Sequence, residues 1–284
     1  MRLQLRDLGL IVLAFSLTAH STLLAQDLTI SDTSPLLTRF ADGVSDFSPA
    51  TELLPAVSDP TAALGAPDPG FLPDFTPLGF VSLGDAPVGS APGEITLSFS
   101  QAINNSLGER IAVFENTNFF NAELAFVEVS SDGTNFARFL NESLVTDPLD
   151  KLDQPATDLD ITFGRNFATI PDRDLVSGFA GVDPERTGTI FDLADLAGDS
   201  SVVNGLVDLD NIGFVRLIDV PGDGRFADSN GNPIFDAFDP GGVTGGFDLD
   251  AIGVVSAATV PEPGSATMLL LMVSAACVRR KKSY

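Results

Sequence analysis

The sequence predicts an all-β protein with a single antiparallel β-sandwich and long loops. The chain has 284 residues, 44% of them apolar, which is enough for a sizeable hydrophobic core. Its 19 Pro and 26 Gly indicate many short turns, as in a β-sandwich. From Glu94 onward, apolar and polar residues alternate with a period of two, and no stretch has the pattern of a long amphipathic helix.

The first 25 residues have the pattern of a secretory signal peptide. Arg2 and Arg6 precede an apolar run at residues 8–17, and Ala25 is the small residue expected at the cleavage site. This signal helix predicts export, and a buried N-terminal helix is the alternative. A linker is expected at residues 26–36, followed by the β-sandwich domain at 37–258. Nine of the 19 prolines lie in residues 41–93, which predicts long irregular loops there.

Period-two alternation predicts the strands of the second part of the domain. In the first of them, Ile95, Leu97 and Phe99 alternate with hydroxyl residues, as in a strand with one buried face. An Asp132-Gly133 pair predicts a tight hairpin. The predicted strands are residues 94–100, 110–115, 124–130, 136–140, 212–220 and 251–257.

The charge of the exported region excludes some classes of partner. Between residues 26 and 260 there are nine basic and 37 acidic side chains, which gives a net charge of −28. Such a field repels nucleic-acid phosphates and anionic lipid surfaces. Metal cations are the partners that this charge favours.

The domain also lacks most of the side chains that catalysis uses. The only His and the only Cys of the chain, His20 and Cys277, lie outside the predicted sandwich. A thiol nucleophile, a His general base, a zinc site of the His or Cys type and an internal disulfide are therefore excluded there. We expect the protein not to be an enzyme.

Pairs of acidic residues at sequence positions i and i+2 predict a cation site. In an extended chain, residues i and i+2 point to one side, so Asp248 and Asp250 are expected to present two carboxylates to a common point. Glu115 and Asp219 end predicted strands and are expected to join them. Outside the cell, Ca²⁺ is the natural counterion for such a group. A solvated strand end is the alternative for Glu115.

The loop between the last two predicted strands provides a second set of oxygen ligands. Counted as a calcium loop, positions 1, 3, 5, 9 and 12 are Asp228, Asn230, Asn232, Asp236 and Asp239. Pro233 stands where an EF-hand requires Gly, and no helices flank the loop, so an EF-hand is rejected. Oxygen ligands without His or Cys still favour calcium. The alternative is a surface loop built from Asx-turns.

The C-terminal residues 259–284 have three parts. Pro261, Glu262 and Pro263 are followed by an apolar segment at 265–278 and then by a basic cluster that includes Arg279 and Arg280. This tail resembles the PEP-CTERM sorting signal of Gram-negative bacteria. The resemblance implies an exosortase as processing enzyme, transient insertion of a sorting helix at 265–278 in the inner membrane, and release to the cell surface or an exopolysaccharide matrix. A plain single-pass anchor is the alternative, although the segment is short for a bilayer.

The middle of the chain, from about residue 40 to 256, resembles a family of secreted bacterial cell-surface proteins that often carry such tails. The segments that carry the resemblance include Phe40-Ala41-Asp42, Val81-Ser82-Leu83-Gly84, Val113-Phe114-Glu115-Asn116, Phe126-Val127-Glu128-Val129, Val215-Arg216-Leu217-Ile218-Asp219, Asp228-Ser229-Asn230-Gly231-Asn232 and Gly246-Phe247-Asp248-Leu249-Asp250. The resemblance implies a jelly-roll β-sandwich without assigned enzymatic activity. The chain departs from the family pattern at residues 237–239 and 150–190.

Together these observations predict a non-catalytic, exported protein of the cell surface or extracellular matrix, with a calcium-stabilised β-sandwich. One alternative is a carbohydrate-binding module that recognises exopolysaccharide, although the domain has neither Trp nor Tyr for sugar stacking. A carboxylate-dependent hydrolase is a further alternative.

Overall fold

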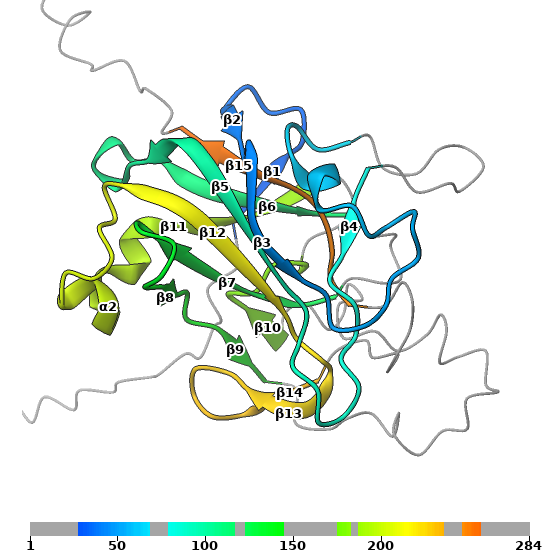
Figure 1. Ribbon diagram of the computed structural model, residues 1–284. Helices are drawn as coiled ribbons and strands as arrows, with labels where there is room; N and C mark the ends of the chain where they lie inside the picture. Colours follow the sequence, from blue (N-terminus) through cyan, green and yellow to red (C-terminus); the bar gives the residue numbers. More distant parts are fainter. Residues whose placement is uncertain are drawn as a thin grey trace, which may run out of the picture.

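Strands dominate the structure, a computed structural model that describes residues 28–68, 79–116, 123–144, 175–182, 187–235 and 246–256. Two antiparallel sheets lie face to face and share one hydrophobic core (Figure 1). The predicted all-β class is therefore confirmed, and the arrangement is that of a β-sandwich.

The first sheet, sheet A, has six strands. Its order is β1 (Leu28–Ser31), β11 (Thr187–Asp192), β6 (Arg110–Glu115), β15 (Asp248–Val255) and β2 (Leu37–Phe40), with β4 (Val81–Ser82) also paired with β15. The predicted strand at 110–115 is β6. The strand predicted at 251–257 begins three residues earlier, at Asp248, and ends at Val255.

The second sheet, sheet B, has five strands. Its order is β3 (Gly43–Ser48), β5 (Glu94–Ile103), β12 (Ile212–Asp219), β7 (Ala125–Ser130) and β8 (Ala137–Arg138). The Asp132-Gly133 turn joins β7 to β8, as predicted, and Val129 pairs with Ala137. The predicted strands at 94–100, 124–130 and 212–220 are β5, β7 and β12, whereas only two residues of the predicted 136–140 strand pair.

The shared core takes every second residue of these strands, because successive side chains of a strand point to opposite faces. In β5 the buried inward residues are Ile95, Leu97 and Phe99, as the sequence predicts, and Val215 and Leu217 of β12 pack with them. Sheet A contributes residues such as Val113 and Ile252. A further apolar cluster lies outside the shared core, with Phe126, Phe179 and Ile218 among its members.

Sheet A curls instead of lying flat. Its two edge strands, β1 and β2, follow each other in the chain, and two successive turns join them through hydrogen bonds from Ser34 N to Ser31 O and from Leu37 N to Ser34 O. Each turn spans less than about 7 Å, while the edges of a flat sheet of five strands would be about 19 Å apart. The edges are thus drawn together, and Ile30 and Leu37 pack in one cluster with Phe114.

This arrangement changes the predicted linker at residues 26–36. Leu28–Ser31 is the edge strand β1. It pairs with β11, and Leu28 lies opposite Ile190. A four-residue strand carries too few alternations to be recognised in sequence. The Pro-rich segment 41–93 likewise contains β3 and β4 in its described part.

The remaining elements are short. Two small hairpins pair β9 (Glu142–Ser143) with β10 (Val176–Ser177) and β13 (Asp223–Ala227) with β14 (Pro233–Phe235). Described helical turns are η1 (Pro60–Ala63), η2 (Asn105–Leu107), η5 (Leu193–Gly198) and α2 (Ser200–Val203).

None of the helices in the described segments combines the length and the apolar character needed to cross a membrane. The predicted signal peptide with Ala25, the apolar segment 265–278, and the sorting residues Pro261, Glu262, Pro263, Arg279 and Arg280 lie outside the described residues.

Candidate functional site

One end of the sandwich is closed by acidic side chains instead of apolar ones. On sheet A, Val113 of β6 faces the core, and Glu115 occupies the next inward position at the end of the strand. After β4, Leu83 faces the core and Asp85 follows two residues later. Both carboxylates are buried: Asp85 is 1% exposed and Glu115 is 8% exposed. The period of two thus places Glu115 at the edge of the core, whereas Asp85 reaches it after β4 has ended, beyond Gly84 with its φ of +75°.

Sheet B supplies two more acids by the same periodicity. In β12, Leu217 faces the core and Asp219, which is 1% exposed, is the next inward residue. Asp219 pairs with Ala125 of β7, and Glu123 precedes Ala125 by two residues. Glu123 N donates a hydrogen bond of 2.9 Å to Glu115 Oε1, which links the two sheets at this end.

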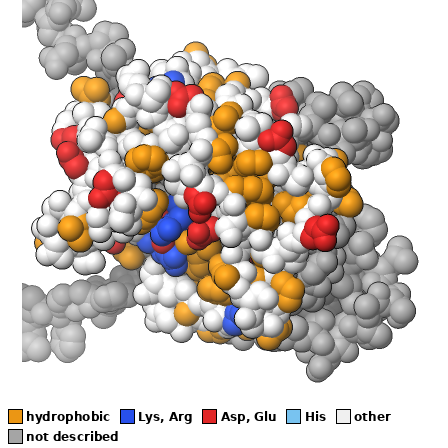
Figure 2. Space-filling model, viewed as in Figure 1, with side chains coloured by type: hydrophobic (Ala, Val, Ile, Leu, Met, Phe, Trp, Pro, Cys, Tyr) orange, Lys and Arg blue, Asp and Glu red, His pale blue; other side chains and the backbone are white. Residues whose placement is uncertain are grey.

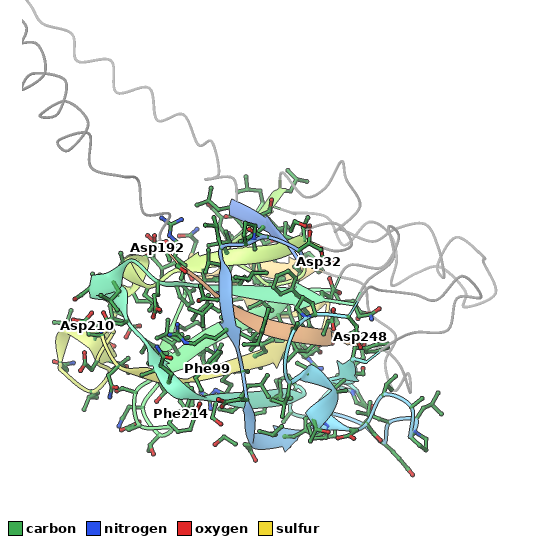
Figure 3. All side chains as sticks on the ribbon, turned by 90° about the horizontal axis from the view of Figure 1, so that it is seen from above. Asp32, Phe99, Asp192, Asp210, Phe214 and Asp248 are labelled. Atoms are coloured by element: carbon green, nitrogen blue, oxygen red, sulfur yellow. The ribbon has the colours of Figure 1, made fainter. Side chains whose placement is uncertain are left out.

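Asp248 is the fifth acid, at the start of β15. It pairs in register with Ser82 of β4, whose side chain hydrogen-bonds to it. Its Oδ1 is buried and has no hydrogen-bond donor among the described residues. The residue before it, Phe247, donates its N–H to Asp219 Oδ1 at 2.9 Å, so the start of β15 is fixed to sheet B. Figure 3 shows Asp248 at the opposite end of the molecule from Asp192 and Asp210.

We call these five residues, Asp85, Glu115, Glu123, Asp219 and Asp248, the acidic end. Burial raises the pKa of Glu123 well above its ordinary value, and the charges of the other four members raise it further. Burial likewise raises the pKa of Asp248; the Ser82 hydrogen bond opposes this shift and the charge of Asp85 adds to it. The members therefore repel one another, and a proton or a cation relieves that repulsion.

Two glycines let the backbone pack closely around the acidic end. Gly246 has a φ of +81°, and a Cβ there would lie 2.6 Å from the carbonyl carbon of Gly84. Gly181 has a φ of +88°, and a Cβ there would lie 1.8 Å from the carbonyl oxygen of Glu123. Side chains at these positions would push the acid-bearing segments apart.

The structure separates Asp250 from Asp248, although the sequence predicts one common point for both. Asp250 Oδ1 accepts the N–H of Asp68 at 3.0 Å. Burial raises the pKa of Asp250 to about 7; the Asp68 N–H lowers it, and the charges of Asp68 and Asp32 raise it. Asp250 is thus surrounded by different acids from those that surround Asp248.

A β-bulge accounts for this separation. Leu249 pairs with Glu115 and Ala251 pairs with Phe114, so Asp250 is the extra residue of β15. Before the bulge the odd-numbered residues of β15 face the core, and after it the even-numbered residues do. Leu249 and Ile252, on either side of the bulge, therefore both belong to the shared core. The expectation assumed regular alternation, which a bulge interrupts.

The acidic end is not a formed metal site as it stands. Among the described residues, no group of three or more Asp, Glu, His or Cys side chains has the arrangement of a metal centre. Of the eight residues predicted as metal ligands, the acidic end brings together Glu115, Asp219 and Asp248. Asp236 lies outside the described residues.

The other predicted ligands form the tip of the β13–β14 hairpin. Asp228 Oδ1 accepts the N–H groups of Asn230 at 2.9 Å and Asn232 at 2.8 Å. Its Oδ2 accepts the N–H of Ser143 at 2.8 Å and the Asn232 side-chain amide at 3.1 Å. Burial raises the pKa of Asp228, but these hydrogen bonds outweigh burial and lower it overall. This is the bonding expected of the Asx-turn alternative.

Asp85 and Glu123 were not among the residues predicted from sequence. Glu123 stands two residues before Ala125, a core position, so the inward alternation of β7 continued by one step would have indicated it. Asp85 follows a two-residue strand in a Pro-rich segment, where that alternation is hard to recognise.

Comparisons with protein-family models, with curated proteins and with solved structures find no match to this chain. The functional interpretation therefore depends on the geometry and chemistry of the described residues.

Proposed function

We propose that this chain is a non-catalytic, exported protein of the cell surface or extracellular matrix, and that calcium bound at the acidic end stabilises its sandwich. The observation that carries the proposal is the convergence of five carboxylates from both sheets at one end of the core. A single cation there would connect the ends of β6 and β12 and the start of β15.

The chemistry of the donors supports calcium. All the charged groups that act on Glu123 are carboxylates, and Ca²⁺ binds six to eight oxygens, with carboxylates among its preferred ligands. Without an ion, the negative charges of the carboxylates repel one another, and carboxylates with raised pKa values retain their protons. We infer that side-chain rotations bring the carboxylate oxygens into contact with the ion. Glu115, Asp219 and Asp248 are the ligands we assign first.

The proposed destination depends on the two ends of the chain. Residues 1–25 would direct export, and the PEP-CTERM-like tail would direct exosortase processing, with residues 265–278 held briefly in the inner membrane. Consecutive strands alternate between the sheets, as in β5, β6 and β7, which supports a jelly-roll-like topology. A calcium-stabilised sandwich also suits a chain whose domain has no Cys for a disulfide.

A calcium titration tests this proposal. Calcium at about 100 times its Kd adds about 2.7 kcal/mol to the free energy of unfolding. For a domain of this size we expect the melting temperature to rise by about 5 to 10 °C. The measurement is a thermal melt of the secreted domain in EGTA and in Ca²⁺, with metal content determined by mass spectrometry.

Two matched variants locate the ion. Asp248→Asn should abolish most of the calcium-dependent shift, whereas Asp250→Asn, two residues along the same strand, should retain it. Each variant is compared with itself in EGTA, so that a change in intrinsic stability cancels. Equal melts of the wild-type domain in EGTA and Ca²⁺, together with no bound calcium, would rule out the calcium part of the proposal.

A further inference from the structure

The outer face of sheet B carries the one place in the described chain where arginines outnumber their acidic partners. Arg39 pairs with Glu109, Arg110 with Asp192 and Arg225 with Asp223, one acid to each arginine. Arg138 and Arg216 instead share Glu128. In a region with a net charge of −28, this leaves one of the two arginines without an acidic partner of its own. On the face of the molecule shown in Figure 2, the largest group of blue atoms lies beside red and orange ones.

Strand pairing holds the two arginines in one row. Arg216 of β12 pairs in register with Glu128 of β7, which pairs with Arg138 of β8. Glu128 is 6% exposed and accepts hydrogen bonds of 2.7 Å from the Nε of both arginines, and a further one from Arg216 Nη2. A buried, fully engaged carboxylate thus fixes the direction of both guanidinium groups.

The outer edges of these guanidinium groups are available. The guanidinium carbon of Arg138 lies 4.4 Å from the centre of the Phe126 ring, and the side chain is 42% exposed; its two Nη groups have no hydrogen-bond acceptor within the described residues. Arg216 bonds through Nε and Nη2, which leaves Nη1. The guanidinium carbon of Arg216 lies 3.9 Å from the centre of the Phe136 ring, and half-buried Phe214 stands two residues away on the same face of β12 (Figure 3).

We propose that this Arg138–Arg216 surface binds the carboxylates of an acidic, uronate-containing sugar chain. The two Nη groups of Arg138 form a fork that matches a carboxylate with two parallel hydrogen bonds, and Nη1 of Arg216 in the same row can donate to a second carboxylate. The half-buried ring of Phe214 and the partly exposed hydroxyl of Ser98, which pairs with Phe214, suit a sugar chain better than a bare anion. The proposal is independent of calcium at the acidic end.

The surrounding negative charge does not prevent such binding. At about 0.15 M salt the Debye length is about 8 Å, so a ligand on this face feels mainly the two arginines, Glu128, and exposed Asp46 of β3, which lies in the same row beyond Thr96 of β5. More distant acids are largely screened. Glu128 cancels one of the two positive charges, which predicts modest affinity and dependence on hydrogen-bond geometry more than on total charge.

The test uses the secreted domain and isothermal titration with short oligogalacturonates at 0.15 M salt. Arg138→Gln should weaken binding about tenfold, since a charge-assisted hydrogen-bond pair is lost. Arg138→Lys should weaken it almost as much, because charge is kept but the fork is lost. The matched control is Arg110→Gln: Arg110 is 39% exposed, also pairs with one carboxylate, and lies in sheet A. It should change affinity less than twofold.

Several results would overturn the proposal. They are no binding by the wild-type domain, equal weakening by Arg138→Gln and Arg110→Gln, or equal binding of methyl-esterified, uncharged oligomers. Because Ca²⁺ can bridge two carboxylates, titrations are run in EGTA and in calcium. Binding that requires calcium and is insensitive to Arg138→Gln would assign the sugar to the acidic end. If poly-glutamate binds as tightly as the oligogalacturonate and loses as much affinity with Arg138→Gln, the partner is an acidic peptide and the sugar assignment fails.

Discussion

The acidic end and the β13–β14 hairpin tip contain similar residues in opposite environments. At the hairpin, Asp228 is buried among N–H donors, which lower its pKa. At the acidic end, Glu123 is buried among carboxylates, which raise its pKa. Both regions were predicted to bind calcium from their oxygen-rich sequences. The difference shows that a buried carboxylate is defined by the groups the fold brings to it, more than by the acids next to it in sequence.

This difference also separates two ways of stabilising the sandwich. The hairpin is complete without an ion, because each oxygen of Asp228 accepts two hydrogen bonds from the chain itself. At the acidic end, the charges of four carboxylates raise the pKa of Glu123, so we expect its stability to depend on protons or cations from the solvent. The following predictions test that contrast.

The largest effect is expected at the hairpin. Asp228→Ala should lower the free energy of unfolding by about 2 to 4 kcal/mol, because buried N–H groups, including that of Ser143, lose their acceptor. The loss should be the same in EGTA and in Ca²⁺, as measured by urea unfolding. Asp228→Asn keeps one acceptor oxygen and should lose about half as much. A loss seen only in calcium would place an ion at the hairpin and break the contrast.

An effect of opposite sign is expected at the acidic end. In EGTA at pH 7.5, Glu123→Gln should raise the free energy of unfolding by about 1 to 3 kcal/mol, because it removes one of five mutually repelling acids and one pKa unit corresponds to about 1.4 kcal/mol. In calcium the gain should shrink or reverse, since a carboxylate near the ion is lost.

The control for this variant is Glu52→Gln, which makes the same charge change at an exposed position. It should alter stability by less than about 0.5 kcal/mol in either condition. If Glu123→Gln destabilises the protein in EGTA, the carboxylates do not repel one another and the acidic end has been misinterpreted.

A further effect is expected in the pH dependence of the metal-free domain. Groups with raised pKa values, Glu123, Asp248 and Asp250, keep protons in the folded state that the unfolded chain releases, so stability should fall as pH rises above about 4. The contribution of Asp250 to this decrease in stability ends near pH 7, because its pKa is about 7. We expect a decrease of at least about 2 to 3 kcal/mol between pH 5 and pH 8 by urea unfolding, since Asp250 alone contributes about 1.4 kcal/mol per pH unit up to its pKa.

On the acid side the sign reverses. The pKa of Glu109 is lowered, chiefly by its hydrogen bond with Arg39, and that of Asp228 by its N–H donors. Their stabilisation is present above the ordinary carboxyl pKa and is lost as pH falls through their lowered values. Stability should therefore be greatest between about pH 4 and 5. A flat profile from pH 5 to 8 in EGTA would contradict the repulsion inferred for the acidic end.

Sequence periodicity predicted the strands that form the centre of each sheet. The strands β5, β6, β7 and β12 each carry at least three alternations, which is enough to show a buried face. Edge strands such as β1 and β3, and the two-residue strand β4, were missed, because their conformation comes from pairing with neighbours distant in the chain. A local sequence pattern predicts a strand poorly where pairing with distant strands determines the conformation.

The site was predicted in part for the same reason. Glu115, Asp219 and Asp248 end or begin strands with visible alternation, so their meeting at one end of the sandwich could be expected. The bulge that separates Asp250 leaves no mark in the sequence. The hydrogen bonds that occupy Asp228 come partly from Ser143, 85 residues away, and no local pattern reports them.

The sequence by itself determined the all-β class, the excess of carboxylates and the lack of thiol and imidazole chemistry in the domain, because composition and period-two alternation are properties of the chain alone. Only the tertiary structure decided which carboxylates meet one another, which meet N–H donors and which meet arginines. Those contacts join residues far apart in sequence, and their energies depend on burial and distance, which exist only once both sheets have closed on the core.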